Sequence, residues 1–353
     1  MLTGLRFQNL RCFPSFRCSF GPGVTAFVGN NAQGKTSILE AICLAMRLQS
    51  PRTSRLGDVL RFDTTQLGLS STYADQELRF TYEKKRRKLS VDGELLPKSS
   101  SYLAASGLIV WMANDDLLLI RGDHAGRRRF LDFVAAQLFP TYRPALRAFE
   151  RALKARNFLL KRDASPPWDE IDAYGALLAD HAAVLTECRQ RLVEKLQPAC
   201  QDVQHHIGGG TEVLHLHYQP AGGADLQREL RDRREEEARR RSTLRGPHRD
   251  ELDLHLDGRR ASQFASEGQQ RTLALALKLG QARVLLAETE KIPLLLLDDI
   301  FGELDPHRRH ALLEVLPPQS QKFLTTTTLD WLEGTSCTPN ALYRVQEGTT
   351  EPA

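Results

Sequence analysis

The amino-acid sequence predicts an α/β fold of mixed β-sheets and helices, into which a mainly helical lobe is inserted. The run Gly29–Ser37 has the form G-x-x-x-x-G-K-T and lies between a strand-like apolar segment and a helix-like one. The continuous apolar run 292–297 is typical of a parallel strand that is covered on both faces. Between these segments, the apolar residues from Asp115 to about Arg241 recur at helical spacing.

Length and composition limit the number of domains, the kinds of partner and the compartment that we expect for this protein. A chain of 353 residues can hold two domains, or one domain with a large insertion. The net charge of +4 is only weak support for a polyanionic partner. The six cysteines show neither a C-x-x-C pair nor metal-ligand spacing, which indicates free thiols in a reducing compartment. No signal peptide and no apolar run of about 20 residues is evident, so we expect a cytoplasmic protein with no membrane partner.

Residues 2–27 predict two or three short strands that lead to the first motif. Arg11 lies in the loop between the first two strands, where it is either a nucleotide contact or an ordinary surface arginine. Further strands are expected between residues 67 and 96, with a hairpin turn at Asp92-Gly93.

The G-x-x-x-x-G-K-T run predicts a phosphate-binding loop. Gly29 and Gly34 let the backbone wrap so that successive N–H groups point at phosphate oxygens, and the next helix presents its positive end to the same anion. Lys35 would reach the β- and γ-phosphates, and the Thr36 hydroxyl would ligate Mg²⁺. The expected nucleotide contacts are Gly29, Asn30, Asn31, Ala32, Gln33, Gly34, Lys35, Thr36 and Ser37.

Two further places carry candidate site residues. Asp298 and Asp299 end the apolar run, at the edge of the sheet where ligands bind in α/β folds. Asp298 would hold Mg²⁺ together with Thr36, and Asp299 would orient or deprotonate the attacking water, so Lys35, Asp298 and Asp299 are the catalytic candidates. The alternative is a solvated pair of acids at a strand end.

Ser266 precedes an apolar helix, and Gln269 completes a capping box with it. A helix start with Gly268 and free N–H groups is a second anion-binding device, so Ser266, Gly268 and Gln269 join the nucleotide-binding candidates.

Three basic stretches are left open. Residues 84–88 are solvated or bound to an anion, and residues 228–241 are best interpreted as a solvated helix with many ion pairs, with DNA contact by some of its arginines as the alternative. Residues 127–129 contain three consecutive arginines. The histidine pairs 205/206 and 215/217 lack the cysteines or helical spacing of a metal site, and we interpret them as surface or strand residues.

The order of these features resembles the ABC-type ATPase head of the SMC, Rad50 and RecF group. No sustained heptads lie between the motifs, so no long coiled coil is expected, and the chain resembles the RecF family with its compact helical lobe. The most specific matches are Gly246-Pro247-His248-Arg249-Asp250 and Gly268-Gln269-Gln270-Arg271. Further matches are Arg52-Thr53, Gly122 to Asp132, Arg156-Asn157, Trp168-Asp169 and Glu303-Leu304-Asp305, and departures are Pro51, Asn114 and Glu267. The expected organisation is a head of residues 1–112 and 243–345, an inserted helical lobe of residues 113–242 and a polar, frayed tail of residues 346–353.

The resemblance implies an ATP-dependent DNA-binding protein of DNA replication, recombinational repair and the SOS response to DNA damage. Its cofactors would be ATP and Mg²⁺, and its ATPase activity would be weak, DNA-stimulated and without motor function. Ser266 and Gly268 would complete the γ-phosphate site of an opposing subunit, so that ATP bridges a homodimer acting as a clamp. The implied partners are double-stranded DNA and single/double-strand junctions, with RecR and RecO, in placing RecA on gapped DNA.

Two other function classes are open. An ABC-transporter subunit would have a short span between its motifs and a switch histidine, whereas Thr325 to Thr328 stand at that place here. An SMC-like, ATP-gated structural DNA-binding module with little turnover remains the alternative.

Overall fold

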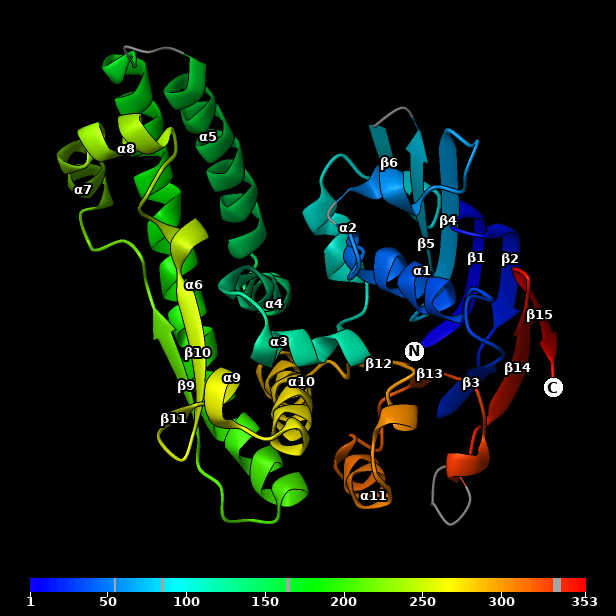
Figure 1. The fold of residues 1–353 in the computed structure, drawn as a ribbon. Helices are drawn as coiled ribbons and strands as arrows, with labels where there is room; N and C mark the ends of the chain where they lie inside the picture. Colours follow the sequence, from blue (N-terminus) through cyan, green and yellow to red (C-terminus); the bar gives the residue numbers. More distant parts are fainter. Residues whose placement is uncertain (54, 84–85, 163–165, 333–337) are drawn as a thin grey trace. The chain divides into compact units, whose positions relative to one another are not determined.

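The computed structural model describes residues 1–53, 55–83, 86–162, 166–332 and 338–353, and it divides the chain into two compact units (Figure 1). Residues 1–116 and 285–353 form the first unit, and residues 117–284 form the second. The expected start of the helical lobe at residue 113 lies close to the first boundary. The expected return to the head at residue 243 differs from the structure, because the strand at 251–256 pairs with the strand at 214–219 and stays with the helices.

A six-stranded antiparallel sheet in the order β2-β1-β4-β5-β6-β7 belongs to the first unit. Its strands alternate, so that Leu5, Phe7 and Phe80 are buried on one face and polar side chains cover the other. Asp92 and Gly93 both have positive φ, as a tight hairpin requires, and the strands predicted between residues 67 and 96 are confirmed. The strands are β1 (Leu2–Leu10), β2 (Phe13–Ser19), β4 (Gln66–Tyr73), β5 (Gln76–Glu83), β6 (Arg86–Val91) and β7 (Glu94–Leu95).

A second sheet of the first unit has the order β15-β14-β3-β13-β12-β8, and all its neighbours are parallel except β14 and β15. The strand predicted before Gly29 is β3, and the apolar run 292–297 contributes β12, with β13 between them. The loops that follow β3 and β12 therefore emerge at the same edge of the sheet. The strands are β3 (Val24–Val28), β8 (Ile109–Ala113), β12 (Leu294–Asp298), β13 (Lys322–Thr326), β14 (Ala341–Gln346) and β15 (Thr349–Pro352).

The prediction of a frayed tail at residues 346–353 was wrong. β15 pairs with β14 through a tight turn at Glu347 and Gly348, which both have positive φ. The strand is polar and mostly exposed, so it lacks the apolar alternation by which strands are recognised, but its backbone hydrogen bonds do not depend on that alternation.

Helix α1 (Lys35–Arg47) contacts strands of both sheets of the first unit, which explains why nearly all of its residues are buried. The remaining helices of this unit are short. They are α2 (Ser99–Ala105), α11 (Pro306–Val315) and the 3₁₀ turns η1 (Leu56–Val59), η2 (Asn114–Leu117), η4 (Phe301–Glu303) and η5 (Asp330–Leu332).

The second unit is mainly helical, as its periodicity predicted. The long helices α5 and α6 pack along each other, and the small sheet β11-β10-β9 contacts α6 (Figure 1). Across the described ranges, no helix is long and apolar enough to cross a membrane. The elements are α3 (Leu118–Arg121), α4 (His124–Leu138), α5 (Tyr142–Arg162), α6 (Trp168–Gly208), β9 (Leu214–Gln219), α7 (Leu226–Asp232), α8 (Arg234–Arg240), η3 (Pro247–Arg249), β10 (Glu251–Leu256), β11 (Arg259–Arg260), α9 (Ala261–Phe264) and α10 (Glu267–Thr289), of which α10 ends in the first unit.

Candidate nucleotide site

The loop between β3 and α1 has the backbone geometry of a phosphate cradle. Gly34 has φ 105°, and a Cβ there would lie 2.7 Å from the Cys12 sulfur. A Cβ on Gly29 would lie 2.3 Å from the carbonyl oxygen of Val345. Glycine is therefore required at both ends of the loop for a physical reason, and the exposed residues between them, Asn30, Asn31 and Ala32, leave that stretch of backbone accessible.

The ammonium group of Lys35 is held inside this loop. Its Nζ donates to the carbonyl oxygens of Gly29, at 2.6 Å, and Asn30, at 2.9 Å, and the residue is 6% exposed. Burial lowers the pKa of Lys35, and the charges of Asp299 and Asp298 oppose this effect. A desolvated cation surrounded by backbone dipoles is well suited to receive an anion.

Asp298 and Thr36, which are far apart in the sequence, meet at the edge of the sheet. The Thr36 hydroxyl donates to Asp298 Oδ1 at 2.9 Å, and the Thr325 hydroxyl donates to the same oxygen at 2.7 Å. Burial raises the pKa of Asp298, while the Thr325 and Thr36 hydroxyls oppose the shift. The structure thus brings together the two residues predicted to share a metal ion.

Asp299 is fixed by its backbone. It has φ 53°, its N–H donates to both the carbonyl oxygen (3.2 Å) and the hydroxyl oxygen (3.0 Å) of Thr325, and its own carbonyl oxygen accepts from Asn114 Nδ2 at 3.1 Å. Burial raises the pKa of its carboxyl group, and the charge of Lys35 opposes the rise. The left-handed backbone at a non-glycine residue is strained and persists only because these hydrogen bonds hold it.

Arg11 is held beside helix α1 by Glu40, an acid that was not among the predicted site residues. Glu40 on α1 is fully buried, and Arg11 forms two hydrogen bonds to it, of 2.8 and 2.7 Å. The Ser50 hydroxyl also donates to Glu40, and Arg52 approaches it within 3.9 Å. A signal was present in the sequence, because an acid in the middle of the apolar run after Lys35 needs a partner when it is buried.

The hairpin formed by β14 and β15 supports the cradle from its other side. The Glu347 N–H donates to Gln33 Oε1 at 2.7 Å, and the Gly348 N–H donates to the Gln33 carbonyl oxygen at 3.3 Å. Together with the close approach of Val345 to Gly29, these contacts make the C-terminal residues part of the loop's wall.

The predicted capping box at Ser266 is confirmed in the second unit. The Ser266 N–H donates to Gln269 Oε1 at 2.7 Å, and the Gln269 N–H donates to Ser266 Oγ at 3.3 Å. Gln269 Nε2 also donates to Glu212 Oε1 at 2.7 Å, which fixes the start of the 23-residue helix α10. Ser266 is exposed, and no described residue accepts from the N–H groups of Glu267 and Gly268.

The Gly-Pro-His-Arg-Asp segment serves the fold of the second unit. Asp250 is buried and accepts from Arg189 Nη1 at 2.7 Å, from the Ala221 N–H at 2.8 Å and from the Tyr218 hydroxyl. Arg189 also donates to the Pro247 carbonyl oxygen. Arg249 of the same segment is exposed.

Two of the three basic stretches are largely occupied by contacts within the chain. Arg127 donates to the carbonyl oxygens of Leu119 and Gly122, and Arg128 donates to that of Asp250. Most arginines of residues 228–241 form ion pairs, as the solvated-helix interpretation expected: Arg231 and Arg234 with Asp172, Arg233 and Arg240 with Glu236, and Arg228 with Asp232. In the third stretch, Lys84 and Lys85 lie outside the described residues.

The histidine pairs form no metal site in the described ranges, where no group of three or more His, Cys, Asp or Glu side chains could hold a metal ion. His215 and His217 lie on strand β9, and His217 stacks on His255 of the neighbouring strand β10.

Comparison with known proteins gives a consistent result. The AAA domain family matches residues 5–154. The "DNA replication and repair protein RecF" of Symbiobacterium thermophilum is 37% identical over 99% of this chain and 97% of the relative, and that of Synechococcus sp. is 34% identical over 99% and 98%. The solved structure described as "the recombination mediator protein RecF-ATPrS in RecFOR pathway" superposes with a TM-score of 0.88, with 26% identity over 100% of this chain and 98% of the other. A solved SMC head bound to the C-winged helix domain of ScpA shares the fold, with a TM-score of 0.56 and 14% identity over 100% of this chain and 96% of that chain.

Proposed function

This chain belongs to the RecF family of DNA replication and repair proteins, and on that premise we propose that it binds and hydrolyses ATP and that bound ATP controls its affinity for DNA. The observation that carries the proposal is the convergence of Lys35, Thr36 and Asp298 at one edge of one sheet. Solved structures described as RecF-ATP and RecF-ATPrS have the same fold over the whole chain, which supports ATP as the nucleotide.

The residues at this edge fit Mg²⁺. Thr36 and Asp298 already point at each other through one hydroxyl–carboxylate hydrogen bond, and magnesium in nucleotide sites takes one or two protein ligands and completes its shell with phosphate oxygens and water. Thr36 and Asp298 would hold the ion, which when bound neutralises negative charge on the phosphates.

The chain's own groups would then divide the work of hydrolysis. Lys35 exchanges its two carbonyl acceptors for phosphate oxygens, and the backbone N–H groups of residues 30–36 bind the remaining oxygens, since those of Gly29 and Ser37 already donate to carbonyl oxygens of the chain. Asp299 accepts a proton from, or orients, the attacking water, and its raised pKa makes it a better base than an ordinary aspartate. Arg11, anchored by Glu40, lies at the flank of the loop as a further nucleotide contact.

The helix start at Ser266 supports an ATP-bridged homodimer. Its capping box is complete, so the exposed hydroxyl and the open N–H groups of Glu267 and Gly268 are available to an external anion. We propose that Ser266, Gly268 and Gln269 complete the γ-phosphate site of a second copy, so that ATP closes a clamp and hydrolysis reopens it. The target is gapped or junction DNA, where the clamp assists RecA loading with RecR and RecO, and the hydrolysis is weak and stimulated by DNA.

Analytical ultracentrifugation tests this proposal directly. We expect wild-type protein with ATP and Mg²⁺ to sediment as a dimer, and protein with ADP or no nucleotide to sediment as a monomer. Lys35→Met and Ser266→Arg should both stay monomeric with ATP, but Ser266→Arg should still bind one ATP per chain because its own phosphate-binding loop is intact. An oligomeric state that ignores nucleotide, or a Ser266→Arg dimer, would exclude the cross-subunit site. Phosphate release measured with and without junction DNA tests the stimulation separately.

A further inference from the structure

The outward, polar face of the antiparallel sheet in the first unit has no role in the nucleotide site. We propose that this face, from β2 to β6, binds the phosphate backbone of double-stranded DNA. The inference rests on the proposed function, because it takes DNA as the partner and assigns the surface that holds it.

The strand register places the polar side chains of this face in two rows. The core residues of the strands, such as Phe7 and Phe80, alternate with them and point the other way. The first row is Ser15, Gln8, Gly68, Thr81 and Lys88, and the second is Arg17, Arg6, Ser70, Arg79 and Ser90. Gln66, Glu83 and Arg86 continue the face at one end.

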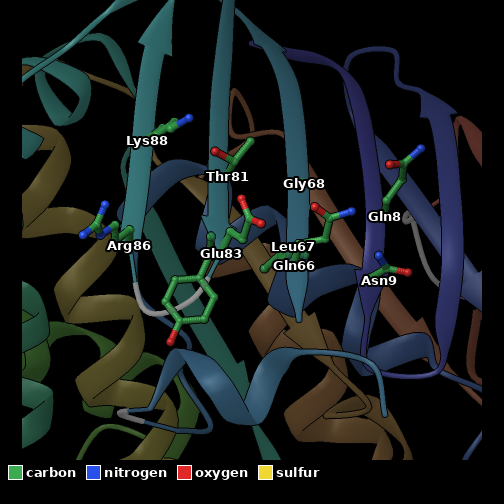
Figure 2. Close-up of a pocket in the computed structure, with 10 residues that line it drawn as sticks. Gln8, Asn9, Gln66, Leu67, Gly68, Thr81, Glu83, Arg86 and Lys88 are labelled. Carbon is green, nitrogen blue, oxygen red and sulfur yellow. The ribbon is translucent and has the colours of Figure 1, made fainter. Parts of the chain in front are cut away.

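A groove of about 730 Å³ opens on this face, and Figure 2 shows its side chains extending from neighbouring strands. Its lining combines the cations Arg86 and Lys88 with neutral hydrogen-bond donors, the acid Glu83 and the residues Leu67 and Tyr82. Gly68 lies in its floor, and a Cβ there would meet no atom within 4 Å, so the centre of the groove is flat and open. The neutral donors are Gln8, Asn9, Gln66 and Thr81.

The cations of this face are more numerous than its acids. Arg79 pairs with Glu77 at 2.9 Å, and Arg86 lies opposite Glu83 in the register. Arg6, Arg17 and Lys88 are exposed, and within the described part of the chain they form no salt bridge. Arg17 and Lys88 have no counter-ion among the described residues, and Arg6 interacts with Glu77 only through its charge and not through a salt bridge, so these cations are more available to an external anion than the ion-paired arginines of residues 228–241.

Duplex DNA matches the size and chemistry of this surface. Five strands at about 4.8 Å spacing span about 19 Å, and duplex DNA carries about 11 negative charges over that length. Serine, threonine, glutamine and arginine side chains are the usual phosphate contacts, and they position DNA without reading its sequence. The two rows contain no large apolar or aromatic side chain of the kind that anchors protein–protein interfaces.

A charge-matched pair of variants tests the assignment. The sheet variant is Arg6→Ala/Arg17→Ala/Lys88→Ala. The control is Arg228→Ala/Arg239→Ala/Arg240→Ala, which removes the same charge from the arginine-rich residues 228–241. Fluorescence anisotropy with a labelled 30-base-pair duplex, in ATP and Mg²⁺ at several salt concentrations, gives the affinity and its salt dependence. We expect the sheet variant to bind at least tenfold more weakly, and its slope of log K against log salt to fall by about 0.9 for each phosphate that it no longer neutralises. The control should match the wild type.

Several results would overturn the assignment. One is an unchanged sheet variant, and another is an equal loss in the control. A third is wild-type protein that binds polyglutamate as tightly as the duplex, which would make an acidic protein the partner of this face. Binding of a fluorescent ATP analogue to both variants shows that the fold is intact. Wild-type protein that binds ATP but no DNA would instead refute the proposed function, and the inference with it.

Discussion

The candidate nucleotide site of the first unit and the Arg189 network of the second unit bury charge in opposite ways. In the first, burial lowers the pKa of Lys35 and raises those of Asp298 and Asp299, so each group is held in surroundings that disfavour its charged form. In the second, burial would also lower the pKa of Arg189, but Asp132, Tyr142 and Asp250 outweigh it and raise the pKa well above the ordinary value. Arg189 donates to Asp132, Asp250 and the Tyr142 hydroxyl at 2.7 to 2.9 Å.

This difference distinguishes a candidate ligand-binding site from an ion-pair network that stabilises the fold. A buried ion whose partners lie within the chain contributes to the stability of the fold, whereas a buried ion that its neighbours satisfy only in part can bind a ligand strongly. Perturbed pKa values alone do not distinguish the two cases. The distinction is whether partners within the chain outweigh the effect of burial, as they do for Arg189 and do not for Lys35, Asp298 and Asp299.

The largest expected effect is the loss of Arg189. Arg189→Met leaves Asp132 and Asp250 without their buried partner, so we expect the second unit to lose about 3–5 kcal/mol of unfolding free energy. Trp168 on α6 reports on this unit alone if Trp111 and Trp331 are replaced by phenylalanine. Arg151→Met, on the exposed side of α5, is the control and should change little. A loss below about 1 kcal/mol for Arg189→Met would mean that the network is not what holds the unit.

The corresponding substitution in the first unit, Lys35→Met, should lower the rate of ATP hydrolysis and leave the unfolding free energy nearly unchanged. Lys35→Met removes a cation that burial disfavours, so unfolding free energy should stay within about 1 kcal/mol of the wild type, while ATP hydrolysis falls by about 10²–10³-fold. Phosphate release and urea denaturation measure the two effects. Lys98→Met, an exposed lysine of the same unit, should leave both unchanged. Equal losses of unfolding free energy for Lys35→Met and Arg189→Met would show that Lys35 stabilises the fold as much as Arg189 does, which would contradict the comparison.

His248 in the second unit and the acids Asp298 and Asp299 in the first should contribute to the pH dependence of stability with opposite signs. Burial lowers the pKa of His248 to about 4, below the unfolded value of 6.5, so the unfolded state binds more protons between these values. The second unit should therefore lose up to about 3 kcal/mol as pH falls from 6.5 to 4. His248→Gln, followed by Trp168 fluorescence in urea, should flatten that slope. The raised pKa values of Asp298 and Asp299 act the other way, because these groups lower stability as pH rises above the ordinary aspartate pKa of 3.8.

The smallest expected effect concerns the wall of the phosphate-binding loop. Gly29→Ala brings a methyl group against the Val345 carbonyl oxygen, so we expect a loss of about 1–3 kcal/mol in the first unit and weaker ATP binding. Gly57→Ala is the control, since a Cβ there meets nothing within 4 Å. Binding of a fluorescent ATP analogue and thermal unfolding give both values. Tight ATP binding by Gly29→Ala would mean that the hairpin yields easily and does not shape the loop.

Features that depend on a few neighbouring residues were predictable from the sequence. The spacing of Ser266 and Gln269 identified the capping box, because both hydrogen bonds form within one helical turn. The strand–loop–helix order around Gly29 and the apolar run before Asp298 correctly predicted strand β3, helix α1 and strand β12, whose loops carry the candidate site residues. Features that depend on distant partners were missed: the roles of Glu40 and Thr325, the pairing of β15 with β14, and the structural role of Arg127 and Arg128.

By itself the sequence determined which groups this protein offers at its candidate nucleotide site, since the motifs fix the identity and order of Gly29, Lys35, Thr36 and Asp298. The tertiary structure alone decided which charges stay available. Arg127 and Arg189 look like any other arginines in the sequence, but carbonyl oxygens and buried acids occupy them, whereas Arg6, Arg17 and Lys88 lie on an open sheet face. The physical reason is that the residue type alone sets the charge of a side chain. Its burial and its interaction partners depend on segments that are distant in the sequence and meet only in the folded protein.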